Sequence, residues 1–251
     1  ASVLTMEERK LILTTAVAEV KGQIPILVGT GTINPNDVKT MTQPAMDLGC
    51  DAALVVTPYY VKPPQRCLIR HVTDVADAVS GLPLVIYNVP GRTAVDFKDE
   101  NIAIAAQHPG IVGVKDATGD VSRVETLRKL TNEHDSSKDF LLYTGDDGTT
   151  LDFMLRGGDG CISVTANVAA NAMHRLVQAA RDGRVEEAKS INDPLMGLHQ
   201  KLFCESNPIP VKWAASRIGL VKSAYCRPPL AQLDPQLESQ VEEALSQAGL
   251  V

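Results

Sequence analysis

The sequence predicts an α/β fold in which six β-strands alternate with α-helices and a helical region follows. Short runs of Val, Ile and Leu recur along the first two thirds of the chain without apolar–polar alternation, which is typical of parallel strands covered on both faces. Segments of helical periodicity separate these runs, and such repetition predicts right-handed βαβ units. With 251 residues, 44% of them hydrophobic, the chain is long enough for one large α/β domain.

The predicted strands are apolar runs that end near glycine or polar residues. In chain order they cover residues 24–31, 52–60, 83–90, 111–118, 140–147 and 160–167. Between them, apolar residues recur three to four positions apart, as a helix with one buried face requires. These predicted helices cover residues 5–21, 35–48, 65–80, 98–107, 121–132, 148–156 and 169–182.

No strand-like run follows residue 170. Residues 183–203, 207–220 and 235–249 have helical periodicity, and Asn207-Pro208-Ile209-Pro210 marks a break because proline favours the first turn of a helix. The chain therefore divides into a strand–helix part over residues 1–182 and a C-terminal helical region over residues 183–251.

Six strands leave two alternatives. A closed parallel barrel needs eight strands, and this chain begins on a helix with no strand before it. Either the sheet is open, or two further strand–helix units precede Ala1.

Composition excludes several classes of function. A net charge of −6 disfavours a surface that binds nucleic acid or anionic membranes. No apolar run approaches the ~20 residues that span a bilayer, so we expect a soluble protein. The five cysteines are scattered without a CxxC pair, which favours reduced thiols over disulfides or a zinc site.

Lys115 is the sharpest candidate for chemistry. It ends the apolar run Ile111-Val112-Gly113-Val114, and strand alternation places it on the face opposite the two valines. We expect Gly113 to clear space beneath it. A lysine in a desolvated pocket has a lowered pKa, and its neutral amine can form a Schiff base with a ketone. The alternative is a rim lysine that pairs with Asp116.

Two further residues suit the same chemistry. Tyr87 holds the equivalent position in the preceding strand, so its phenol would lie near Lys115 and could relay protons. Arg92 follows in a predicted loop over the same strand ends, where its guanidinium could clamp a carboxylate. A tyrosine that caps the core and an arginine paired with Asp96 are the alternatives.

Other motifs in the sequence indicate a function less strongly. "GTGTIN" and "RGGDGC" lack the spacing of nucleotide-binding loops. Asp146-Asp147 resembles a metal-binding pair without a third ligand, so a hydrogen-bonding or helix N-cap role is favoured. No metal is expected.

The strand ends taken together resemble the dihydrodipicolinate synthase family of pyruvate-dependent class I aldolases. The resemblance covers nearly the whole chain, and its motifs occur in order: "VTPYY" (56–60), "YNVPGRT" (87–93), "GVKDATGD" (113–120), "GDD" (145–147), "ISVTANV" (162–168) and "NPIPVKW" (207–213). It implies an eight-stranded (β/α) barrel with a C-terminal helical extension, in which residues 1–182 form a partial barrel catalytic domain.

The resemblance also implies an activity and a set of site residues. The activity is condensation of pyruvate with L-aspartate 4-semialdehyde in lysine and diaminopimelate biosynthesis. Lys115 would form the Schiff base, and Tyr87 would relay protons together with Tyr60, which reaches into a neighbouring subunit. Arg92 would hold the aldehyde's carboxylate. Gly145 and Ile162 would line the pyruvate pocket.

The same resemblance leaves alternatives. N-acetylneuraminate lyase and 2-keto-3-deoxy sugar-acid aldolases share the lysine, and "YNVPGRT" with Arg92 favours the synthase. Family members begin with about 45–50 further residues that supply two strands of the barrel. Two strand–helix units are therefore expected before Ala1, and a chain without them is expected to be impaired, or to be an inactive relative.

The remaining expectations concern cofactors, partners and location. Neither a metal nor an organic cofactor is needed, because the protonated imine is itself the electron sink. Small-molecule substrates are the expected partners, without nucleic acid or membrane, and the subunits would form a homotetramer built as a dimer of dimers. The expected location is the cytoplasm, or the plastid stroma in a photosynthetic eukaryote.

Overall fold

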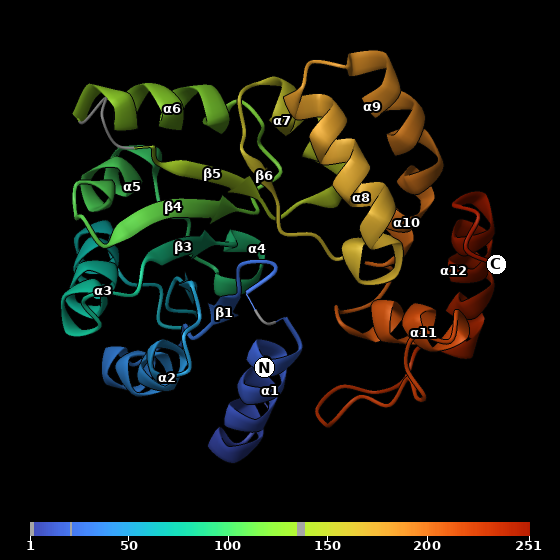
Figure 1. The fold of residues 1–251 in the computed structure, drawn as a ribbon, viewed down its shortest axis with the longest axis horizontal. Coiled ribbons are helices and arrows are strands. Elements are labelled where there is room, and N and C mark those ends of the chain that lie inside the picture. The colour runs from blue at the N-terminus through green and yellow to red at the C-terminus, as the bar shows by residue number, and fades with distance from the viewer. Residues whose placement is uncertain (1–2, 21, 135–138) are drawn as a thin grey trace. The chain divides into compact units, whose positions relative to one another are not determined.

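Five parallel strands and the helices between them build the first of two units in the computed structural model, which describes residues 3–20, 22–134 and 139–251 (Figure 1). This unit spans Ala1–Gly145, and the second spans Asp146–Val251. Neighbours in sequence pair in the order in which they occur: β1 (Leu27–Gly29), β2 (Ala52–Val56), β3 (Leu84–Asn88), β4 (Ile111–Asp116) and β5 (Leu141–Thr144). The predicted parallel α/β arrangement is thus confirmed for this unit.

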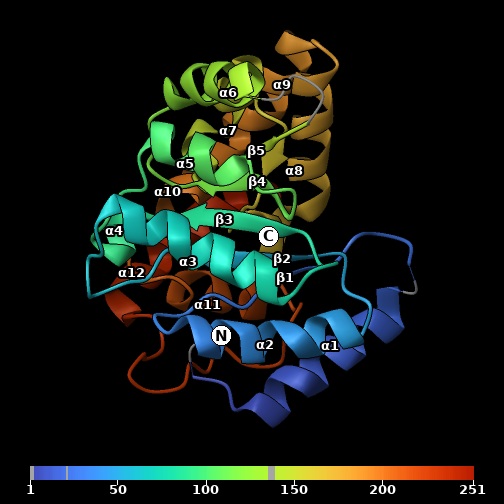
Figure 2. The ribbon, with the colours of Figure 1, turned by 90° about the vertical axis from the view of Figure 1, so that its left-hand side faces the viewer.

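The helices of the first unit are α1 (Met6–Val20), α2 (Pro35–Asp47), α3 (Gln65–Ala78), α4 (Pro90–Thr93), α5 (Asp99–Ala106) and α6 (Arg123–His134). Helices α2, α3, α5 and α6 pack side by side in chain order, and α3 and α5 contact β4 (Figure 2). Helix α3 shows why: Leu68, Val72 and Val75 recur on one face and are buried. The strands are therefore covered by the helices that connect them.

The register of β3 and β4 positions the candidate site. Tyr87 pairs with Lys115 and Asn88 pairs with Asp116, at the carboxyl ends of the two strands. On the other side of β4, Lys115 pairs with Tyr143 of β5. Because side chains alternate along a strand, Tyr87 and Lys115 share one face, and Asn88 and Asp116 share the opposite face.

The second unit is mostly helical. It holds a short strand, β6 (Gly160–Cys161), and the helices η1 (Asp147–Thr149), α7 (Thr150–Leu155), α8 (Ala166–Arg181), α9 (Val185–Asn192), η2 (Asp193–Leu195), α10 (Met196–Lys201), α11 (Ile209–Arg217) and α12 (Pro235–Gln247). Leu176, Leu198, Leu202, Val241 and Leu245 lie at the centre of its apolar core. Each predicted C-terminal segment contains helix, as expected.

The structure corrects three local predictions. The strand predicted over 160–167 ends at Cys161, because the amides of Val164 and Thr165 donate to the Asp147 carboxylate instead of a neighbouring strand. The helix predicted over 183–203 is divided by the 3₁₀ turn at 193–195, whose proline at 194 cannot donate to a regular helix. Arg92 lies in the one-turn helix α4, begun by Pro90, and not in a loop.

The eight-stranded barrel is not confirmed. The described residues contain six strands, and the chain enters its first strand, β1, after helix α1. The two further units expected before Ala1 are likewise not confirmed. Lys21, the predicted end of the first helix, lies outside the described residues.

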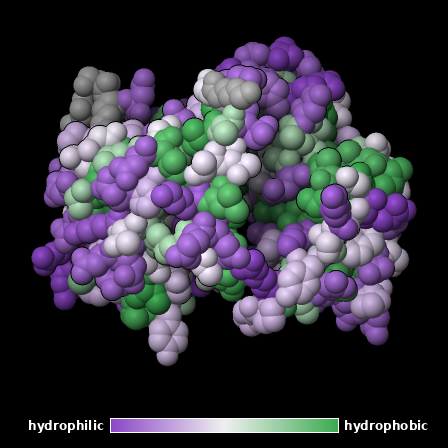
Figure 3. Space-filling view, turned by 60° about the horizontal axis from the view of Figure 1, so that its bottom comes forward, coloured by the Kyte–Doolittle hydropathy of each residue, from purple (hydrophilic) through white to green (hydrophobic). Residues whose placement is uncertain are grey.

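The surface mixes apolar and hydrophilic side chains, as the face in Figure 3 shows. In the first unit, α1 has no buried residue and exposes Leu11 and Ile12, and its Arg9 donates to the carbonyl oxygen of Gly29. No described helix has the length and the apolar character to cross a membrane.

Candidate active site

Lys115 and Tyr87 meet across the β3–β4 ladder. The Lys115 Nζ lies 4.3 Å from the centroid of the Tyr87 ring, and both side chains are half-buried. A cation within about 6 Å of an aromatic face is attracted by the ring's quadrupole, so the contact fixes the amine over the ring. Sequence alternation predicted this shared face, and the observed register brings the two residues together.

Gly145 leaves the space that the lysine side chain occupies. A Cβ at position 145 would lie 2.6 Å from the Cε of Lys115 and 2.8 Å from the Cβ of Ala117, so no larger residue fits without displacing the lysine. The Gly145 amide donates to the Asp116 carbonyl oxygen at 2.7 Å, which holds this backbone close. Gly145 therefore lies against the candidate nucleophile.

The role expected of Gly113 was wrong. A Cβ at this position would lie 2.6 Å from the carbonyl oxygen of Leu141, and the nearest atoms all belong to Leu141. Gly113 thus admits the backbone of β5 beside β4, and the space around Lys115 comes from Gly145.

The phenol of Tyr87 is held in its protonated form. Burial raises the pKa of Tyr87, and the positive charge of Arg92 partly offsets this by lowering it. A protonated phenol beside an amine can donate a hydrogen bond and exchange a proton with a reacting oxygen. Arg92 itself is exposed on α4, one turn of helix away from the end of β3.

Behind this pair, on the opposite face of β3 and β4, lies a buried polar cluster that the sequence did not predict. Asn88 donates to the carboxylates of Asp96 and Asp116, at 2.9 Å in each case. Arg123 forms ion pairs with Asp96 at 2.9 Å and with Asp99 at 2.6 Å. The signal available in the sequence was that Asn88 and Asp116 each directly follow a candidate catalytic residue.

Tyr60 lies apart from this pair within the chain. It follows β2 in a segment where its φ is 70°, and its residue is 86% exposed. A side chain that exposed does not pack against Lys115 or Tyr87. Its neighbour Tyr59 instead lies within hydrogen-bonding distance of the Thr32 hydroxyl, at 3.3 Å.

Ile162 belongs to the second unit, where it follows β6 and is half-buried. The segment after it is shaped by Asp147, whose Oδ2 accepts from the amides of Val164 at 3.0 Å and Thr165 at 2.8 Å. Asp146 caps η1 by accepting from the Thr149 amide, so the hydrogen-bonding interpretation of Asp146-Asp147 is confirmed. Within the described residues, no group of three or more potential ligands is placed to hold a metal ion.

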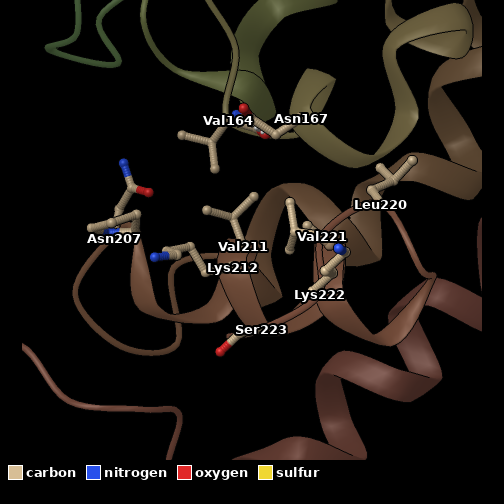
Figure 4. A pocket seen from close by; sticks show the side chains of 11 residues that line it. Val164, Asn167, Asn207, Val211, Lys212, Leu220, Val221, Lys222 and Ser223 are labelled. Carbon is tan, nitrogen blue, oxygen red and sulfur yellow. Dashed lines mark hydrogen bonds between the residues drawn. The ribbon is translucent and has the colours of Figure 1, made fainter. Parts of the chain in front are cut away.

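A cavity of about 660 Å³ also lies within the second unit, between the start of α8, helix α11 and residues 220–223 (Figure 4). Lys212 and Lys222 are among its lining residues, together with Asn207. The ammonium of Lys212 donates to the carbonyl oxygen of Tyr225, so this lysine joins α11 to the following segment. Its ammonium is therefore engaged by a main-chain oxygen.

Comparison with known proteins decides the family. The model of the dihydrodipicolinate synthetase family matches residues 1–248. The chain belongs to this family. Among dihydrodipicolinate synthetase family members, 4-hydroxy-tetrahydrodipicolinate synthase from Pseudomonas aeruginosa is 43% identical over 251 residues, which are 100% of this chain and 84% of that protein. The enzyme of the same name from Gluconacetobacter diazotrophicus is 46% identical over 248 residues, covering 99% of this chain and 82% of that protein.

Solved structures of the family agree. The chloride-inhibited dihydrodipicolinate synthase from Acinetobacter baumannii, complexed with pyruvate, matches with a TM-score of 0.94 and 44% identity over 100% of this chain and 84% of that one. Dihydrodipicolinate synthase from Thermotoga maritima matches with a TM-score of 0.95 and 33% identity, with the same coverage. The predicted family is therefore confirmed.

Proposed function

We propose that this chain condenses pyruvate with L-aspartate 4-semialdehyde to form 4-hydroxy-tetrahydrodipicolinate. The observation that carries the proposal is the position of Lys115, at the carboxyl end of β4, with its Nζ 4.3 Å from the Tyr87 ring centroid and Gly145 packed against its stem. The relatives of this name, at 43% and 46% identity, support the same reaction. The pyruvate complex of the Acinetobacter relative supports pyruvate as the first substrate.

The first step is capture of pyruvate. The neutral amine of Lys115 attacks the C2 carbonyl to give a carbinolamine, which then loses water to form a protonated imine. As the carbinolamine forms, the phenol of Tyr87 gives a proton to the former carbonyl oxygen and takes one from the attacking nitrogen. It then gives its proton to the departing hydroxyl, which leaves as water, and the resulting phenolate takes up the proton that the methyl group loses in the next step. The methyl group next to the imine then loses a proton, and the electron pair forms an enamine.

The second step makes the carbon–carbon bond. The enamine carbon attacks the aldehyde carbon of the semialdehyde, while Arg92 binds its carboxylate through two parallel hydrogen bonds. The charge of Arg92 already acts on the Tyr87 phenol, which supports a second-substrate site close to the reacting centre. The substrate's own amine then attacks the imine carbon, closes the ring and releases Lys115. The protonated imine serves as the electron sink throughout.

Assembly and location complete the proposal. An 86% exposed Tyr60 supports the idea that this side chain reaches the site of a neighbouring subunit in a homotetramer. Light scattering coupled to gel filtration tests this, and a monomeric mass at micromolar concentration would contradict it. A cytoplasmic location and the eight-stranded barrel also remain part of the proposal.

Borohydride reduction in the presence of pyruvate tests the chemistry. We expect one reduced adduct per chain, mapped to Lys115 by mass spectrometry, and none in Lys115→Ala. Lys129→Ala, which removes an exposed lysine of α6, is the matched control and should be modified as fully as the unsubstituted chain. Modification at another lysine, or none at all, would overturn the assignment.

Product analysis separates the synthase from its sister aldolases. The chain is supplied with pyruvate and either L-aspartate 4-semialdehyde or a sugar aldehyde. We expect turnover with the semialdehyde, and a loss of at least ~100-fold in kcat/KM for it in Arg92→Ala, because a bidentate carboxylate contact is lost. Preference for the sugar aldehyde would favour the lyase activity instead.

A further inference from the structure

The buried polar cluster behind the candidate active site joins the ends of the two strands that carry Lys115 and Tyr87. Asn88 is fully buried and uses its whole amide: Nδ2 donates to Asp116 and to Asp96, and Oδ1 accepts from the Phe97 amide at 3.0 Å. Since Asn88 pairs with Asp116 in the register next to Tyr87 and Lys115, this side-chain bond ties β3 to β4 directly behind the reacting groups.

Arg123 completes the cluster from the first residue of α6. Its side chain is 12% exposed, and it lies against three carboxylates that come from separate segments. Besides the ion pairs with Asp96 and Asp99, its Nη2 donates to the Phe97 carbonyl oxygen at 2.8 Å, and its Nε lies 3.8 Å from Asp116 Oδ1. One planar guanidinium therefore ties α5 to the segment between α4 and α5, and it also lies against Asp116 at the end of β4.

Main-chain hydrogen bonds continue just beyond the β3–β4 ladder. Asn88 and Asp116 are the last residues of their strands, and the amide of Ala117, which donates to the Asn88 carbonyl oxygen at 2.8 Å, is the next main-chain bond after the ladder. Side-chain bonds on the outer face thus add restraint where the ladder ends. Buried ion clusters contribute little net stability compared with apolar packing, but they specify geometry.

We propose that Arg123 and Asn88 are positioning residues for the Tyr87–Lys115 pair, which hold the ends of β3 and β4 in the register at which the amine faces the phenol. The proposal rests on the proposed function, because it assigns a role to residues that act through Lys115. Neither residue touches substrate. Their effect is on the rate at which the imine forms, since misplacing reacting groups by about 1 Å costs as much as ~100-fold.

Arg123→Lys tests this, with Arg128→Lys as the matched control. Arg128 is a half-buried arginine on the same helix, and it donates to the Phe140 carbonyl oxygen at 2.8 Å. This hydrogen bond does not involve the carboxylates of the cluster. Lysine keeps the charge but loses the planar fork. The measurement is the rate of pyruvate adduct formation per active site, by rapid mixing, borohydride quench and intact mass.

We expect Arg123→Lys to slow adduct formation by ~10–100-fold and to lower kcat by a similar factor, with KM for the semialdehyde within about twofold, because Arg92 is untouched. Arg128→Lys should stay within about twofold of the unsubstituted chain in every parameter. A merely structural role would lower the fraction of active sites and leave the rate per site unchanged, and that result would overturn the proposal.

Asn88→Ser decides the matter if Arg123→Lys does not fold. Serine retains a hydroxyl but cannot bridge Asp96 and Asp116 together, so the same slowing is expected, with folding checked by far-ultraviolet circular dichroism. An unchanged rate per site in a folded Asn88→Ser chain would also overturn the proposal. Absence of any adduct in the unsubstituted chain would instead refute the proposed function, so the two failures are distinguishable.

Discussion

Buried carboxylates are satisfied in two different ways in the two units of the chain. In the first unit, Asp96, Asp99 and Asp116 share one guanidinium and one asparagine amide. In the second, Asp147 is 1% exposed and is satisfied by the main-chain amides of Val164 and Thr165. The first arrangement crowds three carboxylates around one guanidinium, with Lys98 as a second cation 2.7 Å from Asp96, and the second gives one carboxylate its own donors.

The consequence is visible in the titration of neighbouring groups. Burial raises the pKa of Asp99 to about 6, and although Arg123 lowers it, Asp116, Glu100 and Asp96 raise it further. In the second unit, burial lowers the pKa of His199, although Asp147 and Asp146 act to raise it. Acidification should therefore relieve the first cluster and strain the second, so the two units should respond to pH with opposite signs.

Asp147→Ala should give the largest effect. It leaves the buried amides of Val164 and Thr165 without an acceptor, and each unsatisfied buried donor costs ~1–3 kcal/mol, so we expect the free energy of unfolding to fall by ~3–5 kcal/mol. Urea unfolding followed by Trp213 fluorescence reports on the second unit, where this residue lies. Asp152→Ala, at an exposed position on α7, is the control and should change stability by less than ~0.5 kcal/mol.

If the free energy of unfolding fell by only ~1 kcal/mol or less in Asp147→Ala, the proposed contrast between the two units would be wrong. It would mean that water or local rearrangement replaces the carboxylate, and that the two units do not differ in how their buried acids are satisfied.

The sequence predicted the parts of this picture that depend on periodicity and on position along a strand. Apolar runs located β1 to β5, and alternation placed Lys115 and Tyr87 on one face. It did not predict the cluster around Arg123, because that depends on which segments pack against the outer face of β3 and β4. Nor did it predict the end of β6, since two amides leave the strand pattern for a side chain 17 and 18 residues away.

The roles of individual glycines show the same limit. Gly113 lies two residues from Lys115 in sequence, and proximity suggested that it made room for the lysine. The atoms that exclude a side chain there belong to the neighbouring strand, and Gly145, thirty residues further on in the sequence, lies against the lysine instead. The position of a glycine in the sequence suggests that a side chain is excluded there. Only the packing shows which neighbouring atoms exclude it.

Asp99→Asn should give the second largest effect, and the effect should be on how the stability of the first unit depends on pH. Asp99 has a folded pKa of about 6 against an ordinary value of 3.8, so the stability it contributes is present below pH 3.8 and is lost as pH rises through about 6. At 1.4 kcal/mol per pH unit, the loss amounts to at most ~3 kcal/mol. The unsubstituted chain should therefore lose protection in β4 and α5 between pH 4 and pH 6, as measured by hydrogen exchange at matched intrinsic rates.

In Asp99→Asn this loss should be absent. Glu100→Gln removes the same charge from the exposed neighbouring position on α5, and it should retain most of the pH dependence. Equal behaviour of the two variants would show that overall charge, and not the crowding of carboxylates around Arg123, sets the response.

His199→Asn should give the smallest effect, with the opposite sign. The Nδ1 of His199 lies 2.9 Å from the Thr165 hydroxyl, and its buried Nε2 has no hydrogen-bond partner, so the neutral ring fits the site and the charged ring does not. Because the folded pKa of His199 is lowered, the stability it contributes is present above pH 6.5 and is lost as pH falls through the folded pKa. We expect the free energy of unfolding to fall between pH 7 and pH 5, as measured by Trp213 fluorescence in urea.

Asparagine matches the position of Nδ1, so His199→Asn should keep the contact with Thr165 and lose the pH dependence. His174→Asn, at an exposed position on α8, is the control and should titrate like the unsubstituted chain. If acid instead stabilised the second unit, Asp147 would be acting as a partner of the imidazolium. The two main-chain amides would then not fully satisfy the Asp147 carboxylate. Asp147 would resemble the carboxylates around Arg123, which need a cation, and the proposed difference between the two units would be wrong.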